Sequence, residues 1–561
     1  ICISMSDYAI IENEKLKPQT NDNVVNLALQ TMEFGKQVLV FNNSKRSSES
    51  TAEKIATQIK NPENKELLKK ISEKILSSVS SPTKQCRRLA SIVEKGVAFH
   101  HSGLVGKQRS LIEKNFKNGL IKVISSTPTL AAGLNLPAYK VIIKDYKRYS
   151  QRGFNDIPIL EFHQMAGRAG RPGKETIGKA VLCVKSDDEL ERVVPKYVFG
   201  EPEEIISKLA VEPTLKMYML SLVSMDMINT KEEIIDFFSN TFYAHQYQDI
   251  ESLKFNLFRI LDILRDYDFI VFDDDYYIAT ELGKKVSELY LNPDTANYFM
   301  ENIDKFIKIF SKENISKFDI YSLIYFVVNT MEMKPLFRVS KVEEDIYSKK
   351  AEDVGDSLVI GFDPFEMDYG VFLSLLKTTE LFSDWINEAH EDFISEKFKV
   401  SPGELNYKVD VVDWLLYCLE ELSLLKKNFY FKNYLNKLRV RFEHGIKEEL
   451  LPLISIKGVG RVRARKLYKQ GFTKLSDLRK ADTLKIAMVV GKSVAESIKF
   501  QVSNGELEPE VAFETKKPKQ IQVREVEVKE VTDDEVELLI ENVEIYEKEK
   551  EETQKKLSSF F

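Results

Sequence analysis

Cysteine, tryptophan and long apolar runs are scarce in this sequence. Only four cysteines and two tryptophans stand among its 561 residues, and the cysteines lie far apart, at positions 2, 86, 183 and 418. This spacing excludes a disulfide framework and a cysteine-based zinc site, so we expect reduced thiols inside a cell. No apolar run has the length that crossing a membrane requires, and the first residues do not read as a secretory signal. The sequence predicts neither membrane association nor a metal centre.

An excess of basic charge is also lacking. The chain carries 81 lysines and arginines against 87 acidic residues, which gives a net charge of −6. Any surface that binds nucleic acid must therefore be local. Hydrophobic residues make up 43% and charged residues 30%, as in an ordinary folded protein. The length predicts about four domains.

Strand and helix patterns alternate over the first third of the chain. Apolar strand patterns lie at 37–41, 96–100, 121–125 and 141–143, and helical patterns at 22–34, near Ser50 onward and at 107–118. Asp22 is suited to cap the first helix and Gly35 to end it. The alternation predicts a parallel sheet covered by helices, in which ligands gather at the carboxyl ends of the strands. His100 and His101 follow one strand, and we interpret this isolated pair as part of a loop, without a metal.

Two arginines among small residues stand out in the stretch Gln164–Gly173, QMAGRAGRPG. A helix would bring Arg168 and Arg171 onto one face, and the neighbouring glycines add no bulk. Two guanidinium groups on such a platform suit a polyphosphate. The alternative is a basic helix end closed by Pro-Gly.

The stretch Ser125–Ala138, SSTPTLAAGLNLPA, favours the first interpretation. Together the two stretches resemble motifs V and VI of the superfamily 2 helicases in the Ski-like group, and most of all the archaeal Hjm-type DNA repair helicases. VLVFNNSKR and VAFHHSGL resemble motifs IV and IVa. The resemblance covers about residues 20 to 500 and implies that residues 20–195 form a second RecA-like helicase domain.

The resemblance also implies roles for the motif residues. It implies catalytic roles for Gln164, Arg168 and Arg171, and ATP binding or coupling for Thr127, Gly133, Asn135 and Gly167. Thr129 is expected to contact DNA.

Two motifs of a complete helicase of this family are missing. The only Gly-Lys-Ser is Gly491–Ser493, with Ile486 where a P-loop needs its first glycine, and there is no D-E-x-H. The lysine that reaches the phosphates of ATP and the carboxylates that hold Mg²⁺ are therefore missing. We expect residues 1–19 to be a remnant or linker from an absent first motor domain. We also expect that this chain alone is inactive, because most contacts to ATP and Mg²⁺ would come from that domain.

The segment 144–157, KDYKRYSQRGFNDI, is basic and aromatic. It can form a hairpin with a glycine-containing turn. The resemblance implies a wedge that opens the duplex, with Tyr149, Arg152 and Phe154 contacting DNA. The alternative is an exposed loop whose aromatic side chains lie along the surface.

Two largely helical regions follow. In residues 196–292, helices and a short hairpin at 269–279 resemble the winged helix of the family. Residues 293–444 resemble its helical ratchet domain, in which Trp414 is expected to stack on a base, the alternative being core packing. Tyr407, with Lys408 beside it, stands where the family often has an arginine, so a phosphate contact there is in doubt.

Residues 445–505 carry a helix-hairpin-helix signature, IKGVGRVRARKL, at 456–467. Its glycines let backbone N–H groups approach a phosphate, and its cations add contacts that do not read sequence. The predicted DNA-binding residues here are Lys457, Gly458, Gly460, Arg461, Arg463 and Arg465.

The last region, 506–561, is an acidic tail with a distinct end, QKKLSSFF. Gln554, Leu557, Phe560 and Phe561 resemble a PCNA-interacting peptide, and one helical turn would group the three apolar side chains into a plug. The alternative is a frayed apolar terminus.

The sequence thus predicts a multidomain chain with an α/β RecA-like domain, a winged helix, an all-α ratchet domain, a helix-hairpin-helix domain and a flexible acidic tail. The function implied by the resemblance is an ATP-dependent 3′–5′ DNA helicase on forked or branched DNA, in replication-linked repair and recombination. Its expected partners are single-stranded and branched DNA and the PCNA sliding clamp. We expect a monomer in the archaeal cytoplasm, at the nucleoid. The alternatives are a Ski-like RNA helicase and a non-catalytic DNA-binding adaptor.

Overall fold

The computed structural model describes residues 16–503 with short gaps, at 80, 132–135, 151–152, 171–176, 248, 310–318 and 366, and two short strands before them. Three predicted nucleotide-site residues, Gly133, Asn135 and Arg171, fall in these gaps, as does Arg152. The predicted tail from 506 onward lies wholly outside the described residues, with its clamp-binding residues.

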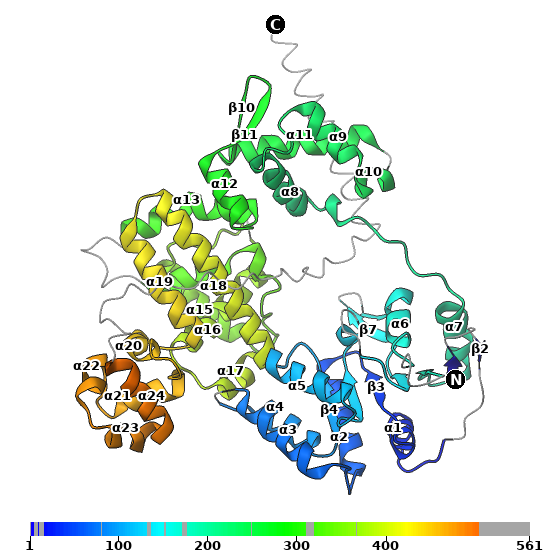
Figure 1. Ribbon diagram of the computed structural model, residues 1–561. Coiled ribbons are helices and arrows are strands. Elements are labelled where there is room, and N and C mark those ends of the chain that lie inside the picture. The colour runs from blue at the N-terminus through cyan, green and yellow to red at the C-terminus, as the bar shows by residue number, and fades with distance from the viewer. Residues whose placement is uncertain are drawn as a thin grey trace. The chain divides into compact units, whose positions relative to one another are not determined.

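A seven-stranded sheet forms the centre of the first domain (Figure 1). Five strands run parallel in the order β9-β6-β3-β5-β4: Lys179–Leu182, Lys140–Ile143, Val38–Phe41, Val123–Ser126 and Val97–His100. The predicted parallel sheet is confirmed. Two short strands precede these five: β1 (Cys2–Ser4) pairs antiparallel with β9, and β2 (Ala9–Ile10) pairs antiparallel with β1. The interpretation of residues 1–19 as a remnant or linker stays a prediction.

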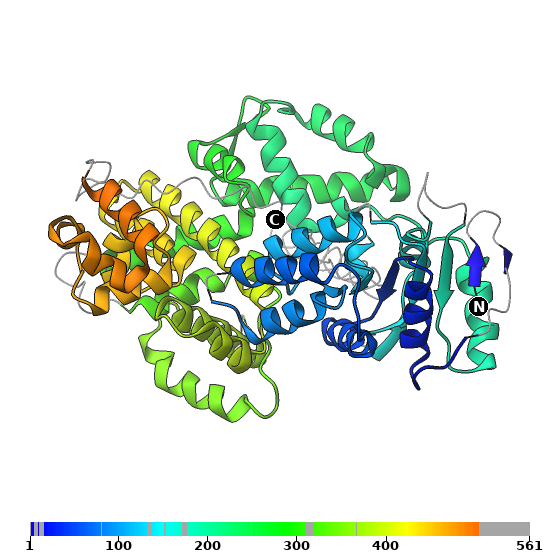
Figure 2. The ribbon, with the colours of Figure 1, turned by 60° about the horizontal axis from the view of Figure 1, so that its bottom comes forward.

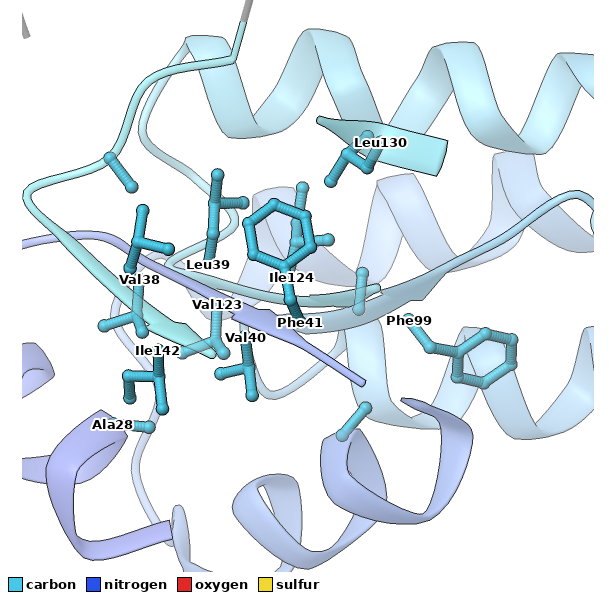
Figure 3. Close-up of a cluster of buried hydrophobic side chains, with 14 of the residues drawn as sticks. Ala28, Val38, Leu39, Val40, Phe41, Phe99, Val123, Ile124, Leu130 and Ile142 are labelled. Atoms are coloured by element: carbon cyan, nitrogen blue, oxygen red, sulfur yellow. The ribbon is translucent and has the colours of Figure 1, made fainter. Parts of the chain in front are cut away.

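Apolar side chains pack both faces of this sheet. All four residues of β3 are at most 1% exposed. Figure 3 shows them beside Phe99, Val123, Ile124 and Ile142 from the neighbouring strands. A strand with no polar face needs helices on both sides, which the chain supplies between its strands.

The helices of this domain, among its described residues, are α1 (Asn23–Glu33), α2 (Lys45–Gln58), α3 (Lys65–Ser77), α4 (Lys84–Val93), α5 (Gly106–Lys117), α6 (Ile159–Ala166) and α7 (Asp187–Val198). Asp22 caps α1 as predicted, and Gly35 follows the helix end with φ of +70°. Helix α2 begins at Lys45, earlier than the predicted start near Ser50. The reason is Ser44, whose hydroxyl accepts a hydrogen bond from the backbone N–H of Ser47.

The next region combines helices with one hairpin. Its elements are α8 (Glu212–Ser224), α9 (Lys231–Ser239), α10 (Phe242–Tyr247), α11 (Ile250–Asp266), β10 (Ile270–Asp273), β11 (Tyr276–Ala279) and α12 (Glu281–Glu288). The predicted hairpin is confirmed: β10 and β11 pair antiparallel, and Figure 1 shows them standing out from the green helices. Gly283 lets α12 pass close to β10, since a Cβ there would lie 1.9 Å from the carbonyl oxygen of Phe269.

Helices make up most of the remaining described residues. They include α13 (Pro293–Ile309), α14 (Ile320–Val328), α15 (Glu344–Val354), α16 (Tyr369–Ile386), α17 (Glu391–Phe398), α18 (Pro402–Leu425) and α19 (Phe429–His444). Among the described residues no helix combines the length and apolar character that crossing a bilayer requires.

Five short helices follow: α20 (Leu451–Ile454), α21 (Arg461–Lys469), α22 (Leu475–Lys480), α23 (Thr483–Val490) and α24 (Lys492–Ser503). They share one apolar core, to which Val440 of α19 and Ile446 also belong. Figure 2 shows this group in orange.

Candidate functional site

The two motif stretches of the first domain meet through their backbones. The N–H of Ala138 donates to the carbonyl of Arg168 at 2.9 Å, and the N–H of Gly170 donates to the carbonyl of Ala138 at 2.7 Å. Ala138 and Ala169 form an isolated parallel bridge. This contact lies just before the amino end of β6 and brings the two stretches together; that they form one nucleotide site stays a prediction.

Arg168 strengthens this junction with its side chain. Its Nε donates to the carbonyl oxygen of Ala131 at 3.1 Å, and its Nη2 donates to the same oxygen. A guanidinium has five N–H donors, so this contact leaves capacity for an anion. Met165 and Ala166 at the end of α6 are buried and fix the helix, whereas Gln164 and Gly167 are exposed. Arg168 therefore stands half-buried at the end of an anchored helix.

Gly178 is a residue of this junction that the sequence did not single out. A Cβ at Gly178 would lie 2.2 Å from the backbone nitrogen of Gly170 and 2.4 Å from the carbonyl carbon of Ala169. Only glycine lets the arginine stretch lie against the start of β9. A glycine directly before a buried strand was the available signal.

The loop after β5 presents two hydroxyl groups. The Oγ1 atoms of Thr127 and Thr129 lie 3.0 Å apart, and Thr129 is exposed. The short helix Pro128–Leu130 holds this loop by burying Leu130. Exposed hydroxyls at the carboxyl end of a parallel strand can meet a phosphate, as predicted for a nucleotide or DNA contact.

Polar side chains join the carboxyl ends of three strands. After β3, Asn42 donates from Nδ2 to the Ser125 Oγ at 2.9 Å, and its Oδ1 accepts from the Thr51 Oγ1 at 2.9 Å. Lys144, after β6, donates from Nζ to the same Thr51 Oγ1 at 3.0 Å. Sequence reasoning missed this network, because its members are far apart in the chain. These side chains form hydrogen bonds with one another, and so they hold together the loops after β3 and β6.

The two histidines are buried and paired with carboxylates. The Nε2 of His100 lies 2.9 Å from Glu113 Oε1, and that of His101 lies 3.2 Å from Glu49 Oε1. Burial lowers the pKa of His100, and the Glu113 carboxylate opposes this only in part. His100 ends β4 rather than lying in a loop. Within the described residues no group of three or more metal-ligating side chains could hold an ion.

The predicted hairpin between the motifs is confirmed as a hairpin. Strands β7 (Lys147–Ser150) and β8 (Gly153–Asp156) pair antiparallel, with Tyr149 opposite Phe154. Tyr149 and Phe154 are described in backbone only. Their role in opening a duplex stays a prediction.

Trp414 lies on the long helix α18 and is half-buried. Its indole Nε1 donates to the carbonyl of Leu289 at 3.3 Å. This contact agrees with the packing alternative, but the side chain is only half-buried, so stacking on a base stays a prediction. Lys408 is only 6% exposed and donates to the carbonyl of Met333, so it is not placed for a phosphate.

The helix-hairpin-helix turn presents glycines and cations. Gly458 has φ of +87°, and a Cβ at Gly458 or Gly460 would have open space around it. Lys457 is exposed, and the exposed Arg463 donates from Nη1 to the carbonyl of Gly458 at 2.7 Å. A flat, open turn of this kind allows backbone N–H groups to approach a phosphate.

Arg461 and Arg465 make protein contacts that the DNA-binding prediction did not foresee. The Arg461 guanidinium lies over the Trp385 ring at 4.9 Å and donates to the carbonyl of Ala389. Arg465 binds Glu388 through two bonds, at 2.6 and 2.7 Å, and Glu449 at 2.8 Å. Residues 461 and 465 are four apart on one helical face, whereas Arg463 points elsewhere. Two of the three arginines thus hold α21 against the end of α16 and the residues that follow it.

Comparison with known proteins gives three matching family models. "Helicase conserved C-terminal domain" matches residues 19–173, "Archaeal helicase, domain 4" matches 321–445, and "SAM-like Helix-hairpin-helix tandem" matches 450–503. The first contains strands β3 to β6 of the sheet and both motif stretches, the second contains Trp414, and the third contains the turn with Gly458 and Gly460. The predicted RecA-like and helix-hairpin-helix domains are confirmed at this level.

Among relatives of the whole chain are proteins named ATP-dependent DNA helicase Hel308. That of Methanocella arvoryzae is 37% identical over 495 residues, covering 86% of this chain and 65% of the relative. That of Methanococcus vannielii is 35% identical over 523 residues, covering 86% of this chain and 68% of the relative. That of Pyrococcus horikoshii is 37% identical over 483 residues, covering 84% and 65%. The chain thus spans about two thirds of the length of these curated relatives.

The domain matches and these identities agree with the resemblance seen in the two motif stretches. The chain therefore belongs to the family of the archaeal ATP-dependent DNA helicases Hel308.

Proposed function

We propose that this chain forms the DNA-gripping part and one side of the ATP site of an Hjm-type DNA helicase. The whole enzyme would move 3′ to 5′ on forked or branched DNA, in replication-linked repair and recombination, as a monomer at the archaeal nucleoid. The relatives' name, ATP-dependent DNA helicase, supports the reaction class. Polarity, junction and pathway are inferred from the family resemblance.

One observation carries the proposal: the arginine stretch is fastened to the strand-end loop by backbone and side-chain bonds. Arg168 binds the carbonyl of Ala131, and its own carbonyl accepts from Ala138. In motors of this kind a fixed cation stabilises charge on the transferred phosphoryl group. A guanidinium held at the end of a helix that is anchored by its buried residues Phe162, Met165 and Ala166 meets that requirement, and we assign Arg171 the same role from the sequence.

ATP with Mg²⁺ is the cofactor that this function implies, and the described residues fit it in part. Arg168 and the hydroxyls of Thr127 and Thr129 suit phosphate oxygens. The described residues do not supply ligands for Mg²⁺, because no described cluster of carboxylates could hold a metal. The sequence also has no G-x-x-x-x-G-K-[ST] stretch to bind the phosphates. We infer that the P-loop lysine and the Mg²⁺-binding carboxylates come from residues other than these.

The remaining regions supply the grip on DNA. We infer a wedge at the hairpin β7–β8, a winged helix in the region of α8–α12 and a ratchet in α18. The match of residues 450–503 to a helix-hairpin-helix tandem supports sequence-independent binding to DNA phosphates. A Ski-like RNA helicase is the weaker alternative, because the helix-hairpin-helix region and the DNA helicase relatives favour DNA.

The ATP-site part of the proposal is tested by ATP hydrolysis with the purified chain and saturating single-stranded DNA. We expect no DNA-stimulated hydrolysis, because the phosphate-binding lysine is missing. DNA-stimulated hydrolysis that Arg171→Ala abolishes would contradict the claim that this chain supplies only one side of the ATP site. A chain that neither binds DNA nor hydrolyses ATP would contradict the function as a whole.

A further inference from the structure

The hairpin β7–β8 is fastened at its open end by a cluster of charged side chains. Lys147 and Asp156 are register partners there, and we call these two residues the hairpin root. Asp156 Oδ2 accepts from the Nη1 of Arg192 at 2.7 Å and from the Nζ of Lys196 at 3.2 Å. Lys147 Nζ lies 3.4 Å from Glu189 Oε1. All three partners of the root stand on one helix, α7.

Helix α7 is a firm support, because its other face is buried in the domain core. Val193 and Tyr197 are at most 1% exposed. The Tyr197 hydroxyl donates to the carbonyl of Ile157, the residue after β8, at 2.8 Å. Arg192 also donates to the Tyr146 hydroxyl, just before β7, at 3.2 Å. Both chain segments that lead into the hairpin are therefore held by the same helix.

Two further contacts reach the hairpin from the motif stretches. Arg148 of β7 pairs with Glu161 of α6 at 3.3 Å, and α6 leads directly to Arg168. On the other side, Asn43 donates from its N–H to Asp145 Oδ2 at 3.3 Å and from Nδ2 to the carbonyl of Lys147 at 3.2 Å. The orientation of the hairpin is thus tied to the elements that carry motifs IV and VI.

A bound ligand does not explain this cluster. A shallow hollow is lined by Lys147, Asp156, Arg192 and Lys196 together with Asn155, Asp188 and Glu189. Its central charges are already paired with one another. Burial opposes ionisation of Asp156, but the hydrogen bonds from Arg192 and Lys196 outweigh it and lower the pKa of Asp156. The carboxylate is therefore ionised and held, as a structural fastening requires.

An isolated two-stranded hairpin is only marginally stable in water, and a single exposed ion pair adds little. A hairpin that pushes against a base pair must nevertheless resist bending at its root. The Asp156 carboxylate is bound by Arg192 and Lys196, which lie on successive turns of the anchored helix α7, and these bonds oppose such bending.

We propose that Asp156, Arg192 and Lys196 are positioning residues that hold the hairpin at a fixed angle, so that binding of a fork opens its first base pair. This rests on the proposed function, in which the hairpin is the wedge. Without the cluster the hairpin would swing about its root, and the strand would still bind while the junction would stay closed.

The fastening itself is tested by hydrogen exchange on the full chain without DNA. Asp156→Asn should speed amide exchange in residues 147–156 several-fold, and so should the double change Arg192→Gln with Lys196→Gln. Combining all three should add little, because they remove the same interaction. Glu53→Gln is the matched control: it removes a 2.6 Å pair with Arg88 elsewhere in this domain and should leave the hairpin unchanged. Unchanged exchange in both root variants would overturn the proposal.

The consequence is tested with a DNA fork that carries 2-aminopurine at its first base pair. Wild-type chain should raise the fluorescence on binding, and Asp156→Asn should lose most of this rise while its affinity for single-stranded DNA stays within a factor of about two. If Asp156→Asn folds poorly, the Arg192→Gln and Lys196→Gln variant on the exposed face of α7 gives the same comparison. Equal opening by wild type and variants, or no opening by a wild type that binds, would overturn the proposal. Failure of the wild-type chain to bind the fork would instead overturn the proposed function. The hydrogen-exchange result would then still show whether Asp156, Arg192 and Lys196 hold the hairpin.

Discussion

Three arginines of helix α21 show how neighbouring residues of one type take different roles. Arg461 and Arg465 face protein groups, and the pKa of Arg461 is lowered by burial beside Trp385. The hydrogen bonds that Arg465 donates to Glu388 and Glu449 raise the pKa of Arg465, so its guanidinium stays protonated. Arg463 lies on the exposed side, next to the turn of Gly458. We therefore propose that Arg463 and Lys457 contact DNA phosphates, whereas Arg461 and Arg465 hold helix α21 in place.

Charge reversal at two of these arginines separates binding from stability. Arg463→Glu should weaken single-stranded DNA binding and reduce the slope of log K against log salt by about 1, since one phosphate contact is lost. Arg465→Glu would place a third carboxylate beside Glu388 and Glu449, and should lower the free energy of unfolding by roughly 1–3 kcal/mol. Fluorescence anisotropy at several salt concentrations and thermal unfolding measure the two effects. The opposite assignment, with Arg465→Glu folded normally and defective in DNA binding, would refute this division.

Because Lys408 is buried, we expect the free energy of unfolding to depend on pH. Lys408 is 6% exposed, and desolvation lowers its pKa to about 8. The unfolded chain, with an ordinary lysine pKa, holds its proton to higher pH, so stability should rise as pH increases from about 8 to about 10. The gain at high pH is on the order of 3 kcal/mol at most.

Lys408→Met should abolish this rise, because it removes the titrating group while keeping an apolar stem. The measurement is chemical unfolding of wild type and variant at pH 7 and pH 10, with Lys399→Met, an exposed lysine, as control. If the free energy of unfolding of wild type and Lys408→Met changed with pH in the same way, Lys408 would not be the group responsible for the pH dependence.

At the scale of elements, the long helix α18 joins the candidate grip to its surroundings. It begins with Ser401 and Glu404, which form a capping box, and Pro402 sits in the first turn. Arg439 of α19 binds Asp413 at 3.0 Å and Glu420 at 3.1 Å, which fixes the face of α18 opposite the solvent. Because α18 is held in this way, the position of Trp414 on it is fixed relative to α19.

Trp414→Ala tests the stacking role of this helix. If the ring stacks on a base, single-stranded DNA binding should weaken by roughly 1–3 kcal/mol. Loss of the bond to Leu289 should also lower the melting temperature somewhat. Titration of DNA into the folded variant at low temperature separates the two effects. A folded variant with wild-type DNA affinity would assign Trp414 to packing.

Local sequence patterns predicted much of the fold but little of the side-chain chemistry. Buried runs such as Val38–Phe41 and the turn between β10 and β11 predicted their elements because these signals act over a few residues. The start of α2 was wrong by several residues, since the capping hydroxyl of Ser44 outweighed the later apolar pattern. The Asp156 cluster, the Asn42 network and the contacts of Arg465 could not be predicted, because each joins residues that only the folded chain brings together.

Across the whole molecule, we propose that the sheet domain binds the nucleotide and that the helical regions after it hold DNA. The motif stretches lie in the sheet domain, and the helix-hairpin-helix region lies at the far end of the described chain. The acidic tail beyond it lies outside the described residues, and we propose that its end binds a sliding clamp while the motor moves.

Deleting Gln554 to Phe561 should abolish binding to an archaeal sliding clamp and leave DNA binding intact. The physical reason is that Leu557, Phe560 and Phe561 would bury apolar surface only against a partner. Titration of the clamp with a peptide of these eight residues, next to a peptide with both phenylalanines changed to alanine, measures the interaction. Equal clamp affinity of the full and shortened chains would leave the terminus without this role.

The proposed function requires that this chain bind forked DNA independently of its sequence. The most direct measurement is the equilibrium affinity of the purified chain for a DNA fork, an RNA fork of the same sequence and a blunt DNA duplex, at several salt concentrations. We expect the DNA fork to bind most tightly, two DNA forks of unrelated sequence to bind with equal affinity, and the affinity to fall steeply as salt increases. Tighter binding to the RNA fork, or equal affinity for the fork and the blunt duplex, would contradict this expectation.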